Sequence, residues 1–292
     1  METDSNSNGR KIERRLLLGA LISVLLLIVF YIAFVHTASG HRIDDSAYLG
    51  RHAVSRKVII LDNELLGLIT KAVVLVAAAV LFLIAALRRC VFIGVVAVAG
   101  FGGAVVGAEI LKDTFPWRSL IAADRLLNAG LQMGTYPSGH ATIGTAFALG
   151  MLLVSSSRWR PWLAVAAGGF SSAFAAGVFF AGWHRPSDAL GALAWSGVCM
   201  NLAAAFAVRL KGRPKAAIAN PERALTGSVG LAILVAAASS VVAAAAAPAY
   251  PHGDLSFFAL TGLIIAGSFS LTAWFGWQLR AVDFVNNRPR LG

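Results

Sequence analysis

Long apolar stretches recur along the whole sequence, and their length limits the fold more than any other feature. A helix needs about 20 apolar residues to cross the hydrocarbon core of a bilayer, within a range of roughly 17 to 25. Eight stretches of that length lie at residues 16–35, 65–87, 91–111, 139–157, 161–183, 187–208, 225–247 and 256–279. We therefore expect an all-α, polytopic membrane protein, a helical bundle of about eight transmembrane helices.

The composition agrees with a membrane protein and argues against two other classes. Hydrophobic residues make up 58% of the 292 residues and charged residues 13%, against roughly 25% charged residues in soluble domains. This excludes a disordered chain and argues against an ordinary soluble enzyme. Cys90 and Cys199 form neither a disulfide framework nor a metal-ligand pattern, so we interpret them as buried residues in helix packing. Gly103 and Gly107 are expected to allow close helix approach.

The distribution of basic residues indicates the orientation in the membrane. The chain has 25 Lys and Arg residues against 14 Asp and Glu residues, an excess that nucleic-acid binding can also produce. Here the basic residues cluster at the ends of the apolar stretches. With a cytoplasmic amino terminus, sixteen of them lie in cytoplasmic segments and eight in outer segments, as the positive-inside rule requires. We expect both termini in the cytoplasm, no nucleic-acid partner and, from the Ala- and Val-rich composition, a bacterial plasma membrane.

The apolar stretches divide into a core and an additional pair. The first stretch is longer than the roughly 7–15 apolar residues of a signal peptide, so we interpret it as a retained helix. The basic, proline-containing segment 209–223 is the best boundary. It separates a six-helix core at residues 1–210 from a cytoplasmic loop and two further helices at residues 211–292. Residues 119–132 fit a short helix at the membrane interface.

Three polar clusters that are distant in the sequence are expected on the same side of the membrane. Ionisable residues in a membrane region are costly and are therefore functional candidates. The clusters are Glu109, Lys112 and Arg118 after the third stretch, residues 137–140 at the start of the fourth, and residues 184–188 between the fifth and sixth. Because two crossings form a round trip, all three clusters reach the outer face.

The residue types in two of these clusters suit a phosphate group. Ser138 and Gly139 begin a helix, where unpaired backbone N–H groups and the positive end of the helix dipole favour an anion. Lys112 and Arg118 add positive charge, the arginine as a planar fork of donors that matches phosphate oxygens. These residues predict a phosphate-binding site at the outer face.

Two histidines and an aspartate add the groups needed for phosphoryl transfer. His140 and His184 supply one side chain for nucleophilic attack and one for protonation of the leaving group. Asp188 lies four residues after His184, so on a helix both can share one face. A carboxylate in that position holds the imidazole in one tautomer and stabilises its charged form.

These residues resemble the signature of a known family. The Lys-to-Arg pair at 112–118, the Pro-Ser-Gly-His run at 137–140 and the His-x-x-x-Asp spacing at 184–188 resemble the three ordered motifs of the type 2 phosphatidic acid phosphatase (PAP2) superfamily. The lipid phosphatases of that family have a six-helix membrane core and need no metal. The resemblance covers about residues 16–210 and is densest at residues 109–191.

The resemblance implies a mechanism without metal or other cofactor. His184 would attack phosphorus and form a phosphohistidine, Asp188 would support it, and His140 would protonate the departing oxygen. The expected enzyme is an integral-membrane phosphatase that hydrolyses a lipid phosphate or pyrophosphate at the outer leaflet. Its phosphoryl oxygens would be bound by Lys112, Arg118, Ser138 and Gly139.

Two positions depart from the family pattern. Five residues rather than six separate Lys112 from Arg118, and Ser119 follows in place of a proline. Val178 stands six residues before the histidine, where the third motif usually carries an arginine. Arg185 either replaces that missing cation as a phosphate ligand or serves an interfacial role.

Two other functions stay open at this stage. A lipid phosphotransferase would pass the phosphoryl group from His184 to an alcohol rather than to water. A catalytically silent transporter or binding protein would use the cluster to recognise an anionic lipid headgroup, an alternative that Val178 favours. Candidate substrates are a polyprenyl phosphate or pyrophosphate, phosphatidic acid and phosphatidylglycerol phosphate, and the outward site favours the prenyl carrier. The oligomeric state is not predicted.

The remaining polar residues receive structural interpretations. Glu109 lies one helical turn from Lys112 and is expected to pair with it, and Lys71 is expected to reach the interface. Trp117 and Trp183 fit an aromatic belt. The other histidines lack metal-like spacing and are expected to be solvated loop residues; they are His36, His41, His52 and His252.

The orientation can be tested by thiol labelling. In a variant with Cys90 and Cys199 replaced by serine, Thr135→Cys should react with a membrane-impermeant maleimide on intact cells, because Thr135 belongs to an outer segment. Arg89→Cys, between the second and third crossings, is the control and should react only in opened cells. Labelling of Thr135→Cys only in opened cells would contradict the outward orientation.

Overall fold

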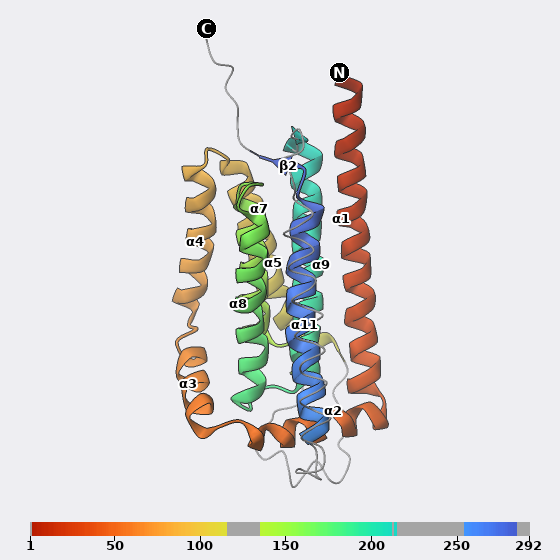
Figure 1. Cartoon of the computed structure of the whole chain (residues 1–292), viewed down its shortest axis with the longest axis vertical. Helices are drawn as coiled ribbons and strands as arrows, with labels where there is room; N and C mark the ends of the chain where they lie inside the picture. The colour runs from red at the N-terminus through yellow and green to blue at the C-terminus, as the bar shows by residue number, and fades with distance from the viewer. Residues whose placement is uncertain (1, 116–134, 212, 215–253, 285–292) are drawn as a thin grey trace.

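The chain folds into an elongated bundle of helices (Figure 1). This computed structural model describes residues 2–115, 135–211, 213–214 and 254–284. Two short strands, β1 (Arg213–Pro214) and β2 (Val282–Asp283), pair antiparallel at the end of the bundle where α1 begins. The helices are α1 (Glu2–Phe30), continued by the π-helical turn η1 (Tyr31–His36), α2 (Ala38–Gly50), the 3-10 turn η2 (Arg51–Ala53), α3 (Arg56–Gly67), α4 (Lys71–Leu87), α5 (Val91–Thr114), α7 (Gly139–Val154), α8 (Arg160–Phe180), α9 (Pro186–Lys211) and α11 (Asp254–Gln278).

Most of the expected membrane crossings correspond to long apolar helices. Within the described ranges, five helices are long and apolar enough to cross a membrane: α1 with η1, α5, α8, α9 and α11. A sixth candidate is α3 with α4, bent by 74° at a break that exposed Lys71 follows, and α7 is a shorter apolar helix. The predicted all-helical bundle is confirmed, and its apolar helices indicate a membrane-embedded protein. A count of eight is not confirmed, because the expected crossing at 225–247 lies outside the described residues, as does the expected interfacial helix at 119–132.

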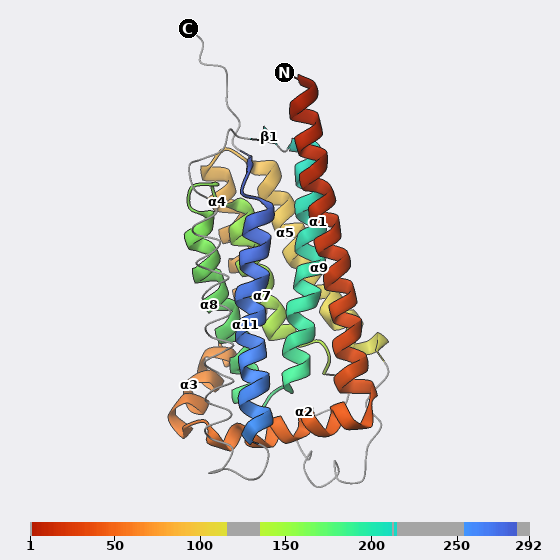
Figure 2. The same ribbon diagram turned by 45° about the vertical axis from the view of Figure 1, so that its right-hand side comes forward.

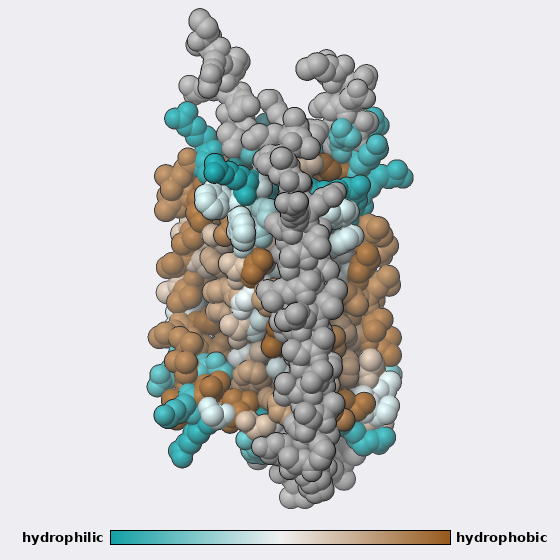
Figure 3. All heavy atoms as spheres, in the orientation of Figure 1, coloured by the Kyte–Doolittle hydropathy of each residue, from teal (hydrophilic) through white to brown (hydrophobic). Residues whose placement is uncertain are grey.

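α9 is the central helix of the bundle. It packs along α1, α5, α7 and α11, and 72% of its most apolar window is buried, against 28% for α1. Leucines on α1 such as Leu18, Leu21 and Leu25 are exposed instead. Figure 3 shows apolar surface over the middle of the bundle and polar residues towards both ends. An apolar belt between polar ends is the surface that a membrane-spanning protein presents to lipid.

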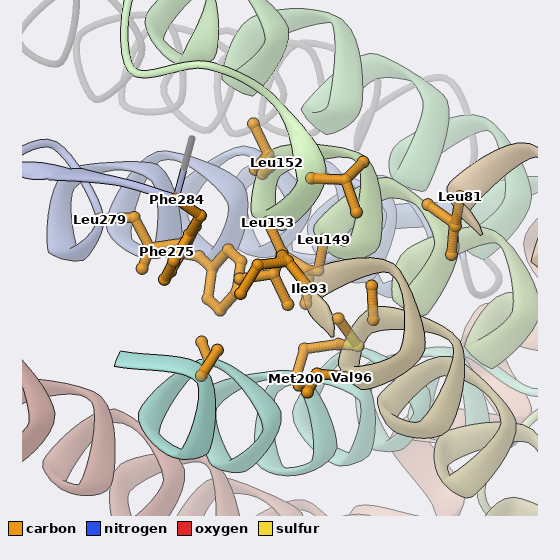
Figure 4. Packing of buried hydrophobic residues seen from close by; sticks show 14 of the residues in the cluster. Leu81, Ile93, Val96, Leu149, Leu152, Leu153, Met200, Phe275, Leu279 and Phe284 are labelled. Atoms are coloured by element: carbon orange, nitrogen blue, oxygen red, sulfur yellow. The ribbon is translucent and has the colours of Figure 1, made fainter. Parts of the chain in front are cut away.

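Close helix contacts define the core. The buried side chains in Figure 4 come from α4, α5, α7, α9 and the segment around the end of α11, and they converge on one apolar cluster. A Cβ on Gly107 would lie 2.4 Å from the Trp195 ring of α9, so the expected close approach at this glycine is confirmed. Among the described residues, nothing lies within 4 Å of a Cβ on Gly103, so the close approach expected there is not found in this part of the chain. Cys90 is buried, as expected, and Cys199 is half-buried.

α2 is an element that the sequence patterns did not predict. It runs crosswise to the long helices and covers one end of the bundle, here named the α2 end (Figures 1 and 2). Gly40, in the first turn of α2, permits the corner between η1 and α2, because a Cβ there would lie 1.6 Å from the Ala33 carbonyl oxygen. His41 is buried in α2, so its interpretation as a solvated loop residue is wrong. The other histidines in that group are His36 and His52, which are exposed, and His252, which lies outside the described residues.

At the opposite end, Arg160 ties α8 to the segment that follows α11. The Arg160 side chain is 1% exposed, and its guanidinium donates to the carbonyl oxygens of Leu152, Ser155, Leu279 and Val282. Arginine has five N–H donors and no acceptor, so a ring of backbone carbonyls satisfies it. Residues 254–284 are therefore packed into the bundle through a buried cation as well as through apolar contacts.

Replacement of Arg160 with methionine should destabilise the bundle, because the buried carbonyl oxygens lose their donors. We expect a loss of about 3 kcal/mol or more in the free energy of unfolding, measured as a lower midpoint of thermal unfolding in detergent. Arg158→Met is the matched control, since Arg158 is exposed. Equal midpoints for the two variants would contradict this role of Arg160.

Candidate active site

The three predicted polar clusters meet at the α2 end of the bundle. The backbone N of Ser138 donates to the carbonyl oxygen of Asp188 over 2.9 Å, so the start of α7 lies against the start of α9. Lys112, in the last turn of α5, reaches the same place: its Nζ lies 3.2 Å from the position of a Cβ on Gly139. The structure thus brings together Lys112, Ser138, Gly139, His140, His184 and Asp188, and Arg118 lies outside the described residues.

His184 and Asp188 form a side-chain pair at the centre of this cluster. Nδ1 of His184 lies 3.3 Å from Oδ2 of Asp188, and Asp188 is fully buried. The same carboxylate oxygen accepts from the backbone N of Arg185 over 3.1 Å, which fixes its position. Because a carboxylate is an acceptor only, it holds the proton of a neutral imidazole on Nδ1. Nε2 of His184 then keeps its lone pair and can act as a nucleophile.

The turn between α8 and α9 places His184. Gly182 follows α8 with φ +77°, in the left-handed region that favours glycine and commonly ends helices. The chain folds back there, and the Val178 carbonyl accepts from the backbone N of Trp183 over 3.0 Å and of His184 over 3.1 Å. The Val178 side chain is fully buried in an apolar cluster whose residues come mainly from α8, α9 and α11. The position at which the PAP2 motif carries an arginine is therefore an apolar core position in this chain.

The first turn of α7 is the predicted anion-binding part of the site. Ser138 caps this helix, its Oγ accepting from Ala141 N over 3.4 Å, and N–H groups in a first turn lack acceptors within the helix. Lys112 Nζ donates to Glu109 Oε1 over 2.7 Å, which confirms the predicted pair. Both lie against Gly139, where a Cβ would be 2.6 Å from that carboxylate oxygen. A positive helix end beside a lysine suits a phosphoryl group.

The second histidine contacts an aromatic side chain from the turn. The His140 and Trp183 rings meet edge to face with centroids 5.2 Å apart, and His140 is close enough to His184 for their charges to interact. Nε1 of Trp183 donates to Oδ1 of Asn63 over 2.7 Å. Trp183 thus contacts a predicted site residue, which the aromatic-belt interpretation does not include, while Trp117 lies outside the described residues.

Arg185 lies in a buried ion pair with a carboxylate of α2 rather than beside Lys112 and the start of α7. It is 4% exposed, and its Nε donates to Oδ1 of Asp45 over 2.5 Å. Asp45 belongs to α2 and also lies 3.2 Å from Nε2 of His41. The Arg185 ion pair is buried, whereas Lys112 pairs with a Glu109 side chain that is 62% exposed, so Arg185 is the less free of the two cations to bind a phosphate. The geometry therefore favours a structural role for Arg185 over replacement of the cation missing at Val178.

α2 supplies contacts that the sequence analysis did not assign to the site. Tyr48 Oη donates to the Gly182 carbonyl oxygen over 2.9 Å, and Asp44 accepts two hydrogen bonds from Ser187. The one available signal is the spacing of His41, Asp44 and Tyr48, which places them on one face of a helix. Polar residues at that spacing more often form a solvated face, so the signal alone does not identify the site.

Comparison with known proteins gives no independent identification. The chain matches no protein-family model, no curated protein and no solved structure. Within the described ranges, no three His, Cys, Asp or Glu side chains are grouped so that they could hold a metal ion. The fold and the site define a helical, membrane-embedded protein in which a His–Asp pair faces a helix start and a lysine.

Gly182→Ala should disturb the turn that carries His184. Its φ of +77° is unfavourable for alanine by about 1–2 kcal/mol, and the new Cβ would lie 2.6 Å from Arg51 Nη1. We expect a lower midpoint of thermal unfolding in detergent. Gly177→Ala is the matched control, because its Cβ would have no neighbour closer than 3.6 Å and alanine favours a helix. A Gly182→Ala variant as stable as Gly177→Ala would contradict this account.

Proposed function

We propose that this protein is an integral-membrane phosphatase of the PAP2 type that hydrolyses a lipid phosphate or pyrophosphate at the outer leaflet. In this proposal the crossings within residues 1–210 form the six-helix core of an eight-crossing protein. The observation that carries it is the 3.3 Å contact between His184 and Asp188, held against the start of α7. An oriented nucleophile beside an anion-binding helix start is the arrangement that phosphoryl transfer requires.

In the first step, Nε2 of His184 attacks phosphorus while the bond from phosphorus to the leaving oxygen breaks. Protonated His140 donates its proton to that oxygen, so the leaving group departs with the proton. Asp188 stabilises the positive charge that develops on the attacking imidazole. Lys112 and the N–H groups at the start of α7 hold the phosphoryl oxygens.

In the second step, a water molecule attacks the phosphohistidine. Neutral His140 takes a proton from the water as its oxygen bonds to phosphorus, and the nitrogen–phosphorus bond breaks. The electron pair of that bond returns to Nε2 of His184, and inorganic phosphate leaves. The cycle consumes one water and restores both histidines to their starting states.

The position of the site suits a substrate whose tail stays in lipid. Glu109 and Lys112 lie at the end of α5, a helix whose Val106 and Ile110 are 60% and 59% exposed. A headgroup bound there leaves its tail near the apolar outer surface of the bundle, where each buried CH₂ contributes about 0.8 kcal/mol. The substrates considered are a polyprenyl phosphate or pyrophosphate, phosphatidic acid and phosphatidylglycerol phosphate. We favour the prenyl carrier because the proposed site faces outward.

Two observations favour a second candidate, a catalytically silent binder or transporter of anionic lipid headgroups. Val178 is buried and apolar, and Arg185 pairs with Asp45, so the site has less positive charge than the motif pattern implies. Simple binding, however, needs neither a His–Asp pair nor a second histidine. A lipid phosphotransferase shares the first step and differs in the second, where an alcohol replaces water.

The phosphatase proposal predicts release of inorganic phosphate by the purified protein from at least one of these lipids, with a chelator present. His184→Ala should lower turnover by about a thousandfold or more, because the nucleophile is lost. His140→Ala should lower it by about 10²–10⁴-fold. His52→Ala is the matched control and should keep the parent rate, since His52 is exposed and outside the site.

Three outcomes of the same assay would count against the proposal. Lipid binding without phosphate release from any lipid would support the silent binder. Transfer of phosphate to an added alcohol in preference to water would support the phosphotransferase. Loss of activity on chelation would contradict a mechanism that needs no metal.

A further inference from the structure

α2 turns one polar face towards the turn that carries His184. Asp44 and Asp45 follow His41 by three and four residues, and Tyr48 follows Asp44 by four, so these residues share one face of the helix. Asp44, Asp45 and Tyr48 contact the chain between residues 182 and 188. α2 therefore supports this turn from outside the helices that carry the motifs.

Asp44 caps α9 from a different helix. Its Oδ1 accepts from the backbone N of Ser187 over 3.0 Å, and its Oδ2 accepts from Ser187 Oγ over 2.6 Å. α9 begins at Pro186, which has no N–H, and the preceding Arg185 has no side-chain acceptor. Within α9, Asp188 reaches back to the backbone N of Arg185. The backbone N of Ser187 takes its acceptor from α2, where a carboxylate also meets the positive helix end. Asp44 is fully buried, so solvent does not compete for these hydrogen bonds.

This cap lies directly beside the His184–Asp188 pair. Ser187 precedes Asp188, so a shift of Ser187 moves the carboxylate that orients the imidazole. At the other end of the turn, Tyr48 holds Gly182, two residues before His184. Both sides of the turn are therefore fixed by one helix. A misplacement of about 1 Å in a well-oriented site can lower the rate about 100-fold.

α11 in turn supports α2. The two helices pack together at the α2 end (Figure 2). Ala47 of α2 shares an apolar cluster with Phe257 and Leu260 of α11 and with Phe179 of α8. α11 lies outside the region that carries the three motifs, yet it reaches the site through α2.

We propose that Asp44 is a positioning residue for the His184–Asp188 pair, acting through Ser187 from a helix that α11 supports. The kinetic consequence rests on the proposed phosphatase function, whereas the orientation of the pair does not depend on the substrate. Lys112 is held by Glu109 on its own helix, and α7 has its own cap in Ser138 besides its backbone hydrogen bond to Asp188. The expected signature is therefore a loss of turnover with little loss of substrate affinity.

Asp44→Ala should lower kcat about 10- to 100-fold and leave KM within about threefold of the parent value. Asp44→Asn keeps a carbonyl acceptor for the backbone N of Ser187 and should recover most of the lost turnover. Ile43→Ala is the matched control, because Ile43 lies on α2 and is 47% exposed. Ser187→Ala added to Asp44→Ala should lower kcat no further, since both residues act through one contact.

A second readout does not depend on activity. In protein labelled with ¹⁵N-histidine, the His184 signals, assigned by their loss in His184→Gln, should report a proton on Nδ1. In Asp44→Ala they should report a mixture of tautomers. Asp44→Glu displaces the carboxylate by one CH₂ and should shift the same signals. This variant is used in place of Asp44→Ala if the Asp44→Ala protein does not fold.

The outcomes separate this inference from the proposed function. Parent-like kcat and parent-like His184 signals in a folded Asp44 variant would overturn the positioning role. If the parent protein hydrolyses none of the lipids but the His184 signals change in the Asp44 variants, the phosphatase proposal fails and the positioning role stands.

Discussion

The hydrogen bond from Ser138 N to the Asp188 carbonyl oxygen joins the start of α7 to the start of α9. Between these two points the chain runs through the bundle along α7 and returns along α8. Helix starts carry unpaired N–H groups and a positive potential, and these groups are costly to bury without partners. Two such ends in contact concentrate that potential at the α2 end. The buried carboxylates Asp44 and Asp188 are the groups that this potential attracts and fixes.

Simple rules predict much of the fold because the membrane leaves few alternatives. A long apolar stretch satisfies its backbone in lipid mainly by forming a helix, and each crossing takes the chain to the other face. Together these rules predict that Lys112, His140 and His184 meet at one end of the bundle. They do not predict α2 or the bend before Lys71, since both depend on contacts that form only after the helices pack.

The polar contacts also divide into those that sequence spacing predicts and those that depend on how the helices pack. The distance between Glu109 and Lys112 is set by one helical turn, so their pair is predictable from the sequence. Arg185 has the sequence context of a phosphate ligand, but its partner Asp45 lies 140 residues earlier. That pairing follows from the path of α2 across the bundle. The interpretation of His41 as a solvated residue is wrong for the same reason, because burial of a polar residue depends on packing rather than on spacing.

The contact between α11 and α2 affects when the site can form during biosynthesis. Ribosomal synthesis proceeds from the amino terminus, so α2 and the turn at residues 182–188 are made before α11. Until residues 254–284 are inserted, the apolar side of α2 around Ala47 lacks its partners Phe257 and Leu260. A nascent chain therefore contains every residue of the three motifs before it contains α11, which packs against α2. Insertion of α11, rather than synthesis of the motifs, sets the moment at which the site geometry is complete.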